Sequence, residues 1–123
     1  MNPVLRYVAA IPAALFILSG LGWAFNPTSA AGGLGMSLAE GVGRSSQIGD
    51  MGAFFLGSGL MIVVGLVRNK RIWFQAPALL MCLAIFYRTL ATLLHDAPFA
   101  ASFVAIELIS AGLLFIAARA SDN

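Results

Sequence analysis

The chain has too few charged residues to cover the surface of a water-soluble domain. Asp, Glu, Lys and Arg make up 10% of its 123 residues, whereas hydrophobic residues make up 60%. Soluble domains carry about 25% charged and about 45–50% apolar residues. The mean hydropathy of +0.93 agrees with this shortage. The composition therefore excludes an ordinary soluble enzyme and a disordered tail, and it predicts a protein embedded in a lipid bilayer.

Residues that serve redox, metal and nucleotide chemistry are also scarce. There is one cysteine and one histidine, and the net charge is only +2. The single cysteine, Cys82, cannot form an internal disulfide or a C-x-x-C pair, and we expect it to be buried in packing. The glycine-rich segment lacks the Lys-Ser/Thr ending of a phosphate-binding loop. No metal-ligand spacing is recognisable, so we assign no catalytic residue, metal or cofactor, and the few basic residues do not predict nucleic-acid binding.

Four long apolar runs are present, at residues 4–25, 47–67, 72–94 and 99–118. Each is close to the roughly 20 residues that cross the hydrocarbon core as a helix. The first run is too long for a signal-peptide core, which has about 7–15 apolar residues. Short connections make consecutive helices antiparallel neighbours. We therefore predict one all-α integral membrane domain over residues 1–123, an antiparallel up-down bundle of four transmembrane helices.

The only long connection covers residues 26–46. Asn26 is a favourable N-cap and Pro27 suits the first helical position, which predicts a short helix that stops at Gly32 and Gly33. Small and apolar residues fill most of the segment. We expect it to lie at the outer interface or to form a lid over the mouth of the bundle.

Basic residues near the ends of the runs predict the orientation. In a four-span topology the two termini and the connection near residue 70 share one side, which holds most of the basic residues: Arg6, Arg68, Lys70, Arg71 and Arg119. The positive-inside rule then places both termini in the cytoplasm. Trp23 and Trp73 lie near opposite ends of their runs, where indoles anchor helices at the interface.

Small residues recur at helical spacing in two runs. Gly49, Ala53, Gly57 and Gly65 form one stripe, and Ala101 and Ala105 form a shorter one. Helices in lipid associate through close packing of small residues. We expect these stripes to pack within the monomer, with a homodimer face as the alternative.

Ionisable residues within the apolar runs are the most informative feature. A charge at the centre of a membrane helix costs about 2.5–3.5 kcal/mol on insertion scales. Arg88 and Glu107 lie on antiparallel runs at similar distances from their shared connection, so we expect them at one depth in the outer half of the bilayer. His95 lies on the helix face of Arg88, while Asp50 starts the preceding run and Arg44 precedes it. We predict that these five residues form a polar ligand-binding pocket open to the outside.

Structural interpretations of the same residues remain open. Arg88 and Glu107 could form a neutralising ion pair that fixes helix register. Asp96 could cap the last helix, with Pro98 in its first turn. Asp50 is favourable near a helix N-terminus and His95 near a C-terminus. Arg44 could be a solvated loop residue.

The motifs together resemble a known group of proteins. They comprise Asn26-Pro27, the glycine-rich Leu34-Gly35 stretch, Gly43-Arg44-Ser45, the Gly49–Phe55 entry into the second run, and the pair Arg88 and Glu107. The chain resembles small bacterial four-helix membrane proteins of a domain-of-unknown-function family, broadly similar to DoxX-like proteins. The resemblance implies a four-helix fold in the bacterial inner membrane. It implies no established activity.

Three functions fit the sequence. The first is binding of a small lipophilic or amphipathic molecule, or a lipid headgroup, in the outer pocket, with an arginine holding an anionic group. The apolar part of this pocket would be lined by Phe54, Phe55, Phe86 and Tyr87. The second is an accessory subunit that stabilises a larger membrane complex, and the third an enzyme that uses His95 with Asp50 or Glu107 as acid and base. The bilayer is the expected surrounding, and a homodimer is an alternative assembly.

Overall fold

The computed structural model describes residues 1–123 and contains five helices. Four are long and apolar enough to cross a membrane: α1 (Pro3–Phe25), α3 (Val42–Arg68), α4 (Ile72–His95) and α5 (Ala101–Arg119). The short helix α2 (Pro27–Gly33) follows α1. The four spanning helices confirm the predicted all-α membrane architecture, and α2 confirms the short helix of the long connection.

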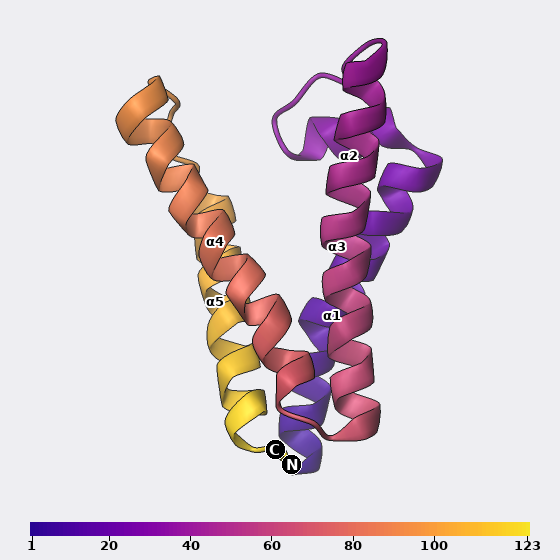
Figure 1. Cartoon of the computed structure of the whole chain (residues 1–123), viewed down its shortest axis with the longest axis vertical. Coiled ribbons are helices and arrows are strands. Elements are labelled where there is room, and N and C mark those ends of the chain that lie inside the picture. Colours follow the sequence, from indigo (N-terminus) through magenta and orange to yellow (C-terminus); the bar gives the residue numbers. More distant parts are fainter.

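The four long helices form two pairs rather than a closed bundle. Helix α1 packs along α3, and α4 packs along α5. The pairs meet at the end that holds both chain termini and diverge toward the opposite end (Figure 1). The core lies mainly where the pairs meet and is rich in alanine: Ala9, Ala13, Phe16, Ile62, Phe74, Ala78, Met81, Ala111, Leu114, Ala117 and Ala118. Alanines let helix backbones approach closely, which explains why the pairs join at this end.

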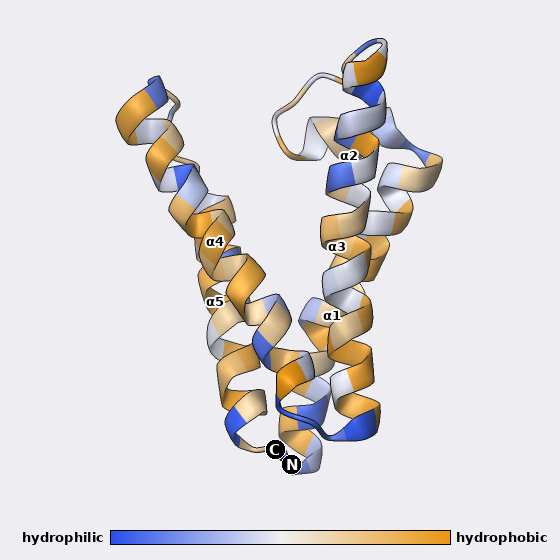
Figure 2. Ribbon diagram, in the orientation of Figure 1, coloured by the Kyte–Doolittle hydropathy of each residue, from blue (hydrophilic) through white to orange (hydrophobic).

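The outward surface of the helices is apolar. Leu18, Phe25 and Leu93 are each more than 60% exposed, among many other large hydrophobic side chains. Figure 2 shows hydrophobic residues along the shafts of the helices and hydrophilic ones mostly at the connections. A soluble monomer rarely exposes apolar patches of this extent. The distribution is that of a multi-pass membrane protein whose shafts face lipid.

Two helix boundaries differ from those predicted. Helix α3 begins at Val42 rather than at residue 47, directly after Gly41, whose φ of +58° breaks the chain direction. Helix α5 begins at Ala101 rather than at residue 99. The interpretation of Asp96 as its N-cap is wrong. Asp96 instead ends α4 as a left-handed C-cap with φ +56°, and Ala100 precedes α5.

Helix α3 starts early because its first turns hold the preceding loop. The Gln47 side chain accepts a hydrogen bond from the Ala39 amide at 2.8 Å and donates one to the Ser37 carbonyl at 3.2 Å. The Arg44 side chain donates to the Ala39 carbonyl at 2.9 Å. These bonds fix the segment between α2 and α3 against the end of α3.

Two single-residue expectations are wrong. Cys82 is exposed on the outer face of α4 instead of buried. Trp23 is 1% exposed and contacts the neighbourhood of Gly52 on α3, so it is a packing residue rather than an interfacial anchor. A Cβ atom built on Gly52 would lie 3.8 Å from the Trp23 Cβ, so Trp23 belongs to the contact between α1 and α3.

The small-residue stripes also pack differently from the prediction. A Cβ atom added to Gly49 or Gly57 would meet nothing within 4 Å, so this part of the stripe faces outward. The close contact of α1 with α3 is made instead by Gly20 against Leu56 and by Gly59 against Ala13 and Ile17. Of the predicted stripe only Gly65 packs tightly, against the Phe74 ring. Ala101 and Ala105 are exposed.

The C-terminal residues bind the connection between α3 and α4. The Arg71 amide donates to the Asp122 carbonyl at 2.8 Å, and the Asp122 amide donates to the Asn69 carbonyl at 3.1 Å. The Arg71 side chain also donates to the Ala118 carbonyl at 3.2 Å. Asn69 is the C-cap of α3, so its bond to Asp122 ties the two helix pairs together at one end, whereas the bonds of Arg71, the N-cap of α4, lie within the α4–α5 pair.

Candidate functional site

An ion pair joins α4 and α5 within their apolar shafts. Arg88 Nε donates to Glu107 Oε1 at 2.7 Å. The Glu107 side chain is 10% exposed and that of Arg88 is 31% exposed. The contact confirms that the two residues lie at one depth, because α4 and α5 run antiparallel and share a short connection. The two charges neutralise each other where an isolated charge would be costly.

The ion pair leaves hydrogen-bonding groups unused on both partners. Glu107 Oε2 is buried and has no hydrogen-bond partner. A guanidinium has five N–H donors, and the protein accepts a hydrogen bond only from the Nε donor of Arg88. The Arg88 guanidinium carbon lies 5.0 Å from the centre of the Phe103 ring, so this ring covers one face of the cation. The pair therefore offers one acceptor and several donors to a further molecule.

The two residues of the ion pair border a cavity between the two helix pairs, here called the inter-pair cavity. Its volume is about 220 Å³, and every long helix contributes to it. Arg88 and Glu107 form its polar wall. The other lining residues are mostly apolar: Leu15, Phe16, Ser19, Leu34, Phe54, Phe55, Met81, Phe103 and Ile106. Bulky Phe54, Phe55 and Phe103 occupy this level of the molecule, in contrast to the alanines where the pairs meet.

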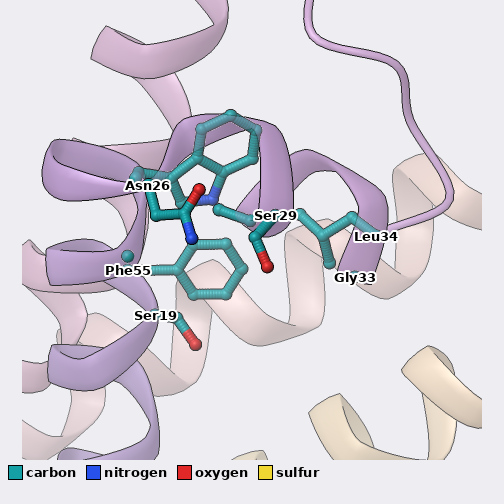
Figure 3. A pocket seen from close by; sticks show the side chains of 9 residues that line it. Ser19, Asn26, Ser29, Gly33, Leu34 and Phe55 are labelled. Atoms are coloured by element: carbon teal, nitrogen blue, oxygen red, sulfur yellow. The ribbon is translucent and has the colours of Figure 1, made fainter.

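A second cavity adjoins the first toward α2. It has a volume of about 350 Å³ and shares Ser19, Leu34 and Phe55 with the inter-pair cavity. Figure 3 shows the Asn26 amide above the Phe55 ring, the Ser29 hydroxyl beside it and Ser19 below it. Although Asn26 occupies the N-cap position of α2, its side chain makes no capping hydrogen bond to this helix. This second cavity contains no charged residue and is lined on one side by uncharged polar groups.

An apolar groove continues from the inter-pair cavity in the opposite direction. It lies between α1 and α5, has a volume of about 190 Å³, and shares Leu15 and Ile106 with the inter-pair cavity. Its other lining residues are Ile11, Pro12, Ile109, Ser110 and Leu113. Along both helices these residues lead from the ion pair toward the end that holds the termini. We call it the α1–α5 groove.

The five predicted site residues are only partly brought together. Arg88 and Glu107 meet, whereas Arg44, Asp50 and His95 are exposed and line none of the cavities described above. Arg44 is engaged with the loop carbonyl of Ala39. His95 is the last residue of α4, at the diverging end of the molecule. Divergence of the helix pairs separates these three positions from the inter-pair cavity.

The aromatic residues divide in a similar way. Phe54 and Phe55 line the inter-pair cavity as predicted. Phe86 and Tyr87 are exposed and pack edge-to-face against each other, outside the cavity. Phe103 was missed, although it lies one helical turn before Glu107 and therefore shares its face. Ser19 and Leu34 were also missed, because they come from distant segments and carry no local signal.

Comparison with protein-family models, with curated proteins and with solved structures finds no match to this chain. The site must therefore be interpreted from its own chemistry. No three of the His, Cys, Asp and Glu side chains lie close enough together to hold a metal ion. The structure shows an ion pair with no net charge at the border of an apolar cavity. Some hydrogen-bonding groups of this pair have no partner in the protein.

Proposed function

We propose that this chain binds a small amphipathic molecule in the inter-pair cavity. The observation that carries the proposal is that Glu107 lines this cavity while its buried Oε2 atom has no hydrogen-bond partner. Leaving a buried acceptor without a hydrogen bond costs about 1–3 kcal/mol. A ligand that supplies the missing donor recovers this energy when it binds.

The remaining wall favours an apolar body on the same ligand. Phe54, Phe55 and Met81 present aromatic and thioether surface within reach of the ion pair. Binding sites for small molecules combine such apolar walls with a few fixed polar groups, which set the orientation of the ligand. The inter-pair cavity has this composition, with polar groups supplied almost entirely by Arg88 and Glu107.

The proposed setting is the bacterial inner membrane, with both termini in the cytoplasm. Both termini and the α3–α4 connection lie at one end of the molecule (Figure 1). The basic residues Arg68, Lys70 and Arg71 belong to this end. Their position supports a cytoplasmic end by the positive-inside rule. The resemblance to DoxX-like proteins supports the same membrane.

A role as an accessory subunit is the second candidate. The outward stripe of Gly49, Ala53 and Gly57 is unoccupied within the monomer. Small residues at this spacing allow close approach of another helix. This candidate predicts a stable second polypeptide after gentle extraction, or a second copy of the chain.

Native mass spectrometry of the chain extracted gently from its own membrane tests the proposal. We expect a stoichiometric small-molecule adduct on the unmodified protein. Ser19→Trp places an indole at the border of the inter-pair cavity and should remove the adduct. Leu18→Trp is the matched control, because Leu18 is exposed on the same helix and lines no cavity.

An adduct that survives Ser19→Trp, or its absence from the unmodified protein, would contradict binding in this cavity. A bound polypeptide without an adduct would favour the accessory role instead. Melting of both variants shows whether the added indole has changed the fold rather than the cavity.

A further inference from the structure

We infer that the ligand is an uncharged amphiphile with a single alkyl tail. Its head both donates and accepts hydrogen bonds, as a hydroxyl or a primary amide does. This inference rests on the proposed function and specifies the chemical class that the inter-pair cavity selects. It departs from the anionic head that the sequence alone suggested for an arginine-lined pocket.

The unused groups of the ion pair define the head. Glu107 Oε2 is buried without a donor, while the Nη groups of Arg88 make no hydrogen bond within the protein. A hydroxyl or amide satisfies both at once. A carboxylate head would place a second negative charge beside Glu107 and leave Oε2 without a donor. An ammonium head would add a positive charge beside Arg88, already neutralised by Glu107. Either charged head would also lose its hydration in an apolar site.

The α1–α5 groove defines the tail. It meets the inter-pair cavity at Leu15 and Ile106 and continues past Ile109 to Leu113. Its lining is almost entirely apolar, its volume is about 190 Å³, and its residues follow α1 and α5 lengthwise. A single extended chain suits this shape better than a fused ring system. With the head at the ion pair, the tail points toward the end that holds the termini.

Binding of four probes with the same twelve-carbon chain tests the head. The probes are dodecanol, dodecanoate, dodecylammonium and dodecane, measured by native mass spectrometry with the purified full chain at neutral pH. We expect dodecanol to bind at least about tenfold more tightly than either charged probe, since a mismatched polar group leaves buried partners unpaired. The preference for dodecanol over dodecane should disappear when Arg88→Leu and Glu107→Leu are combined, because neither side chain then offers a donor or an acceptor.

The tail is tested by a pair of neighbouring substitutions on α5. Ile109→Trp fills the α1–α5 groove and should weaken dodecanol binding about tenfold or more, because the tail then loses its apolar contact with the groove. Hexanol, whose chain is shorter, should lose much less. Leu108→Trp is the matched control, because Leu108 is similarly exposed but lines no cavity.

The outcomes separate the inference from the function on which it rests. Preferential binding of dodecanoate or dodecylammonium overturns the uncharged head but retains a ligand-binding cavity. Equal loss of dodecanol in Ile109→Trp and Leu108→Trp overturns the tail position. Binding of none of the four probes, together with no adduct from the native membrane, overturns both the inference and the proposed function.

Discussion

At the scale of single residues, the contact of Arg88 with Glu107 is incomplete in a specific way. One Nε–Oε1 bond of 2.7 Å joins the two groups, although an arginine and a carboxylate often form two parallel bonds. The cation also rests against Phe103. The Arg88 cation is thus held from two sides, and the second carboxylate oxygen of Glu107 is buried without a hydrogen-bond partner. An ion pair needed only for helix register would gain from closing both bonds.

The contribution of the Arg88–Glu107 pair to stability is testable by replacing each charged side chain with the neutral amide of glutamine. Arg88→Gln or Glu107→Gln alone should lower stability by about 2 kcal/mol, because each leaves a largely buried charge without its partner. The double substitution should recover most of this loss, since two neutral amides can hydrogen-bond to each other. Thermal melting of the purified protein in detergent measures all three variants.

Asp50→Asn provides the control for these charge changes. Asp50 is exposed and makes no hydrogen bond through its side chain. The melting temperature of the Asp50→Asn variant should therefore equal that of the unmodified protein within experimental error. A double variant that is as unstable as the sum of the two single variants would show that Arg88 and Glu107 are not energetically coupled.

At the scale of helices, close contact depends on particular glycines rather than on their number. A Cβ atom on Gly59 would lie 2.6 Å from Ile17 Cγ1 and 3.0 Å from the Ala13 carbonyl oxygen, whereas one on Gly57 would meet nothing. Both positions lie on α3, two residues apart. The helix rotation about its own axis therefore decides which glycine serves the interface.

This difference gives a prediction for two alanine substitutions. Gly59→Ala should destabilise the protein by about 1–3 kcal/mol, the usual cost of overpacking a close contact. Gly57→Ala should be neutral or stabilising by up to about 1 kcal/mol, because alanine favours the helix more than glycine does. Thermal melting distinguishes the two. Equal destabilisation would contradict the packing of α1 against α3 through Gly59.

The end of α4 supports a second prediction at this scale. Asp96 has φ +56° and makes no side-chain hydrogen bond, so its left-handed conformation has little local compensation. Asp96→Gly should raise stability by about 0.5–1 kcal/mol, because glycine adopts this conformation without steric cost. Chemical unfolding provides the measurement.

Asn69 is the comparison position, with φ +51° at the end of α3. Its side chain donates to the Asp122 carboxylate at 3.4 Å, so Asn69→Gly loses a contact as it gains conformational freedom. We expect little net change. A larger gain at position 69 than at position 96 would show that the bond to the tail contributes nothing.

The sequence predicted the spanning helices well and the candidate site only in part. Long apolar runs and short connections are local signals, so four helices and the depth of Arg88 relative to Glu107 followed directly. The positions of Asp50 and His95 depended on how α3 and α4 diverge, which no local pattern reports. Trp23 and Cys82 were misplaced for a related reason: in an apolar helix, hydrophobicity alone does not distinguish the lipid-facing side from the packed side.

At the scale of the whole molecule, the two ends differ in how firmly they are joined. Near the termini, the alanine-rich core and the bonds of Asn69 to Asp122 in the C-terminal tail connect both helix pairs. At the other end the pairs diverge (Figure 1). Ser29 and Lys70 lie at opposite ends of the molecule. Labelling at these two positions can therefore measure how the molecule is oriented in the membrane.

Labelling with a membrane-impermeant maleimide tests this orientation. Both variants are made in a Cys82→Ser background. Ser29→Cys should react in spheroplasts, whose inner membrane is intact, whereas Lys70→Cys should react only after this membrane is broken. Both side chains are exposed, so access rather than burial decides the result. Reaction of both variants from the same side would rule out the proposed topology, and the reverse pattern would invert it.

The divergence of the helix pairs has a mechanical consequence for the surrounding bilayer. Because the ends near α2 and the α4–α5 connection lie farther apart than the ends near the termini (Figure 1), the chain occupies more area in one leaflet than in the other. A wedge of this kind relieves elastic stress where a membrane bends so that the wider leaflet is on the convex side. The protein should therefore accumulate in strongly curved membranes.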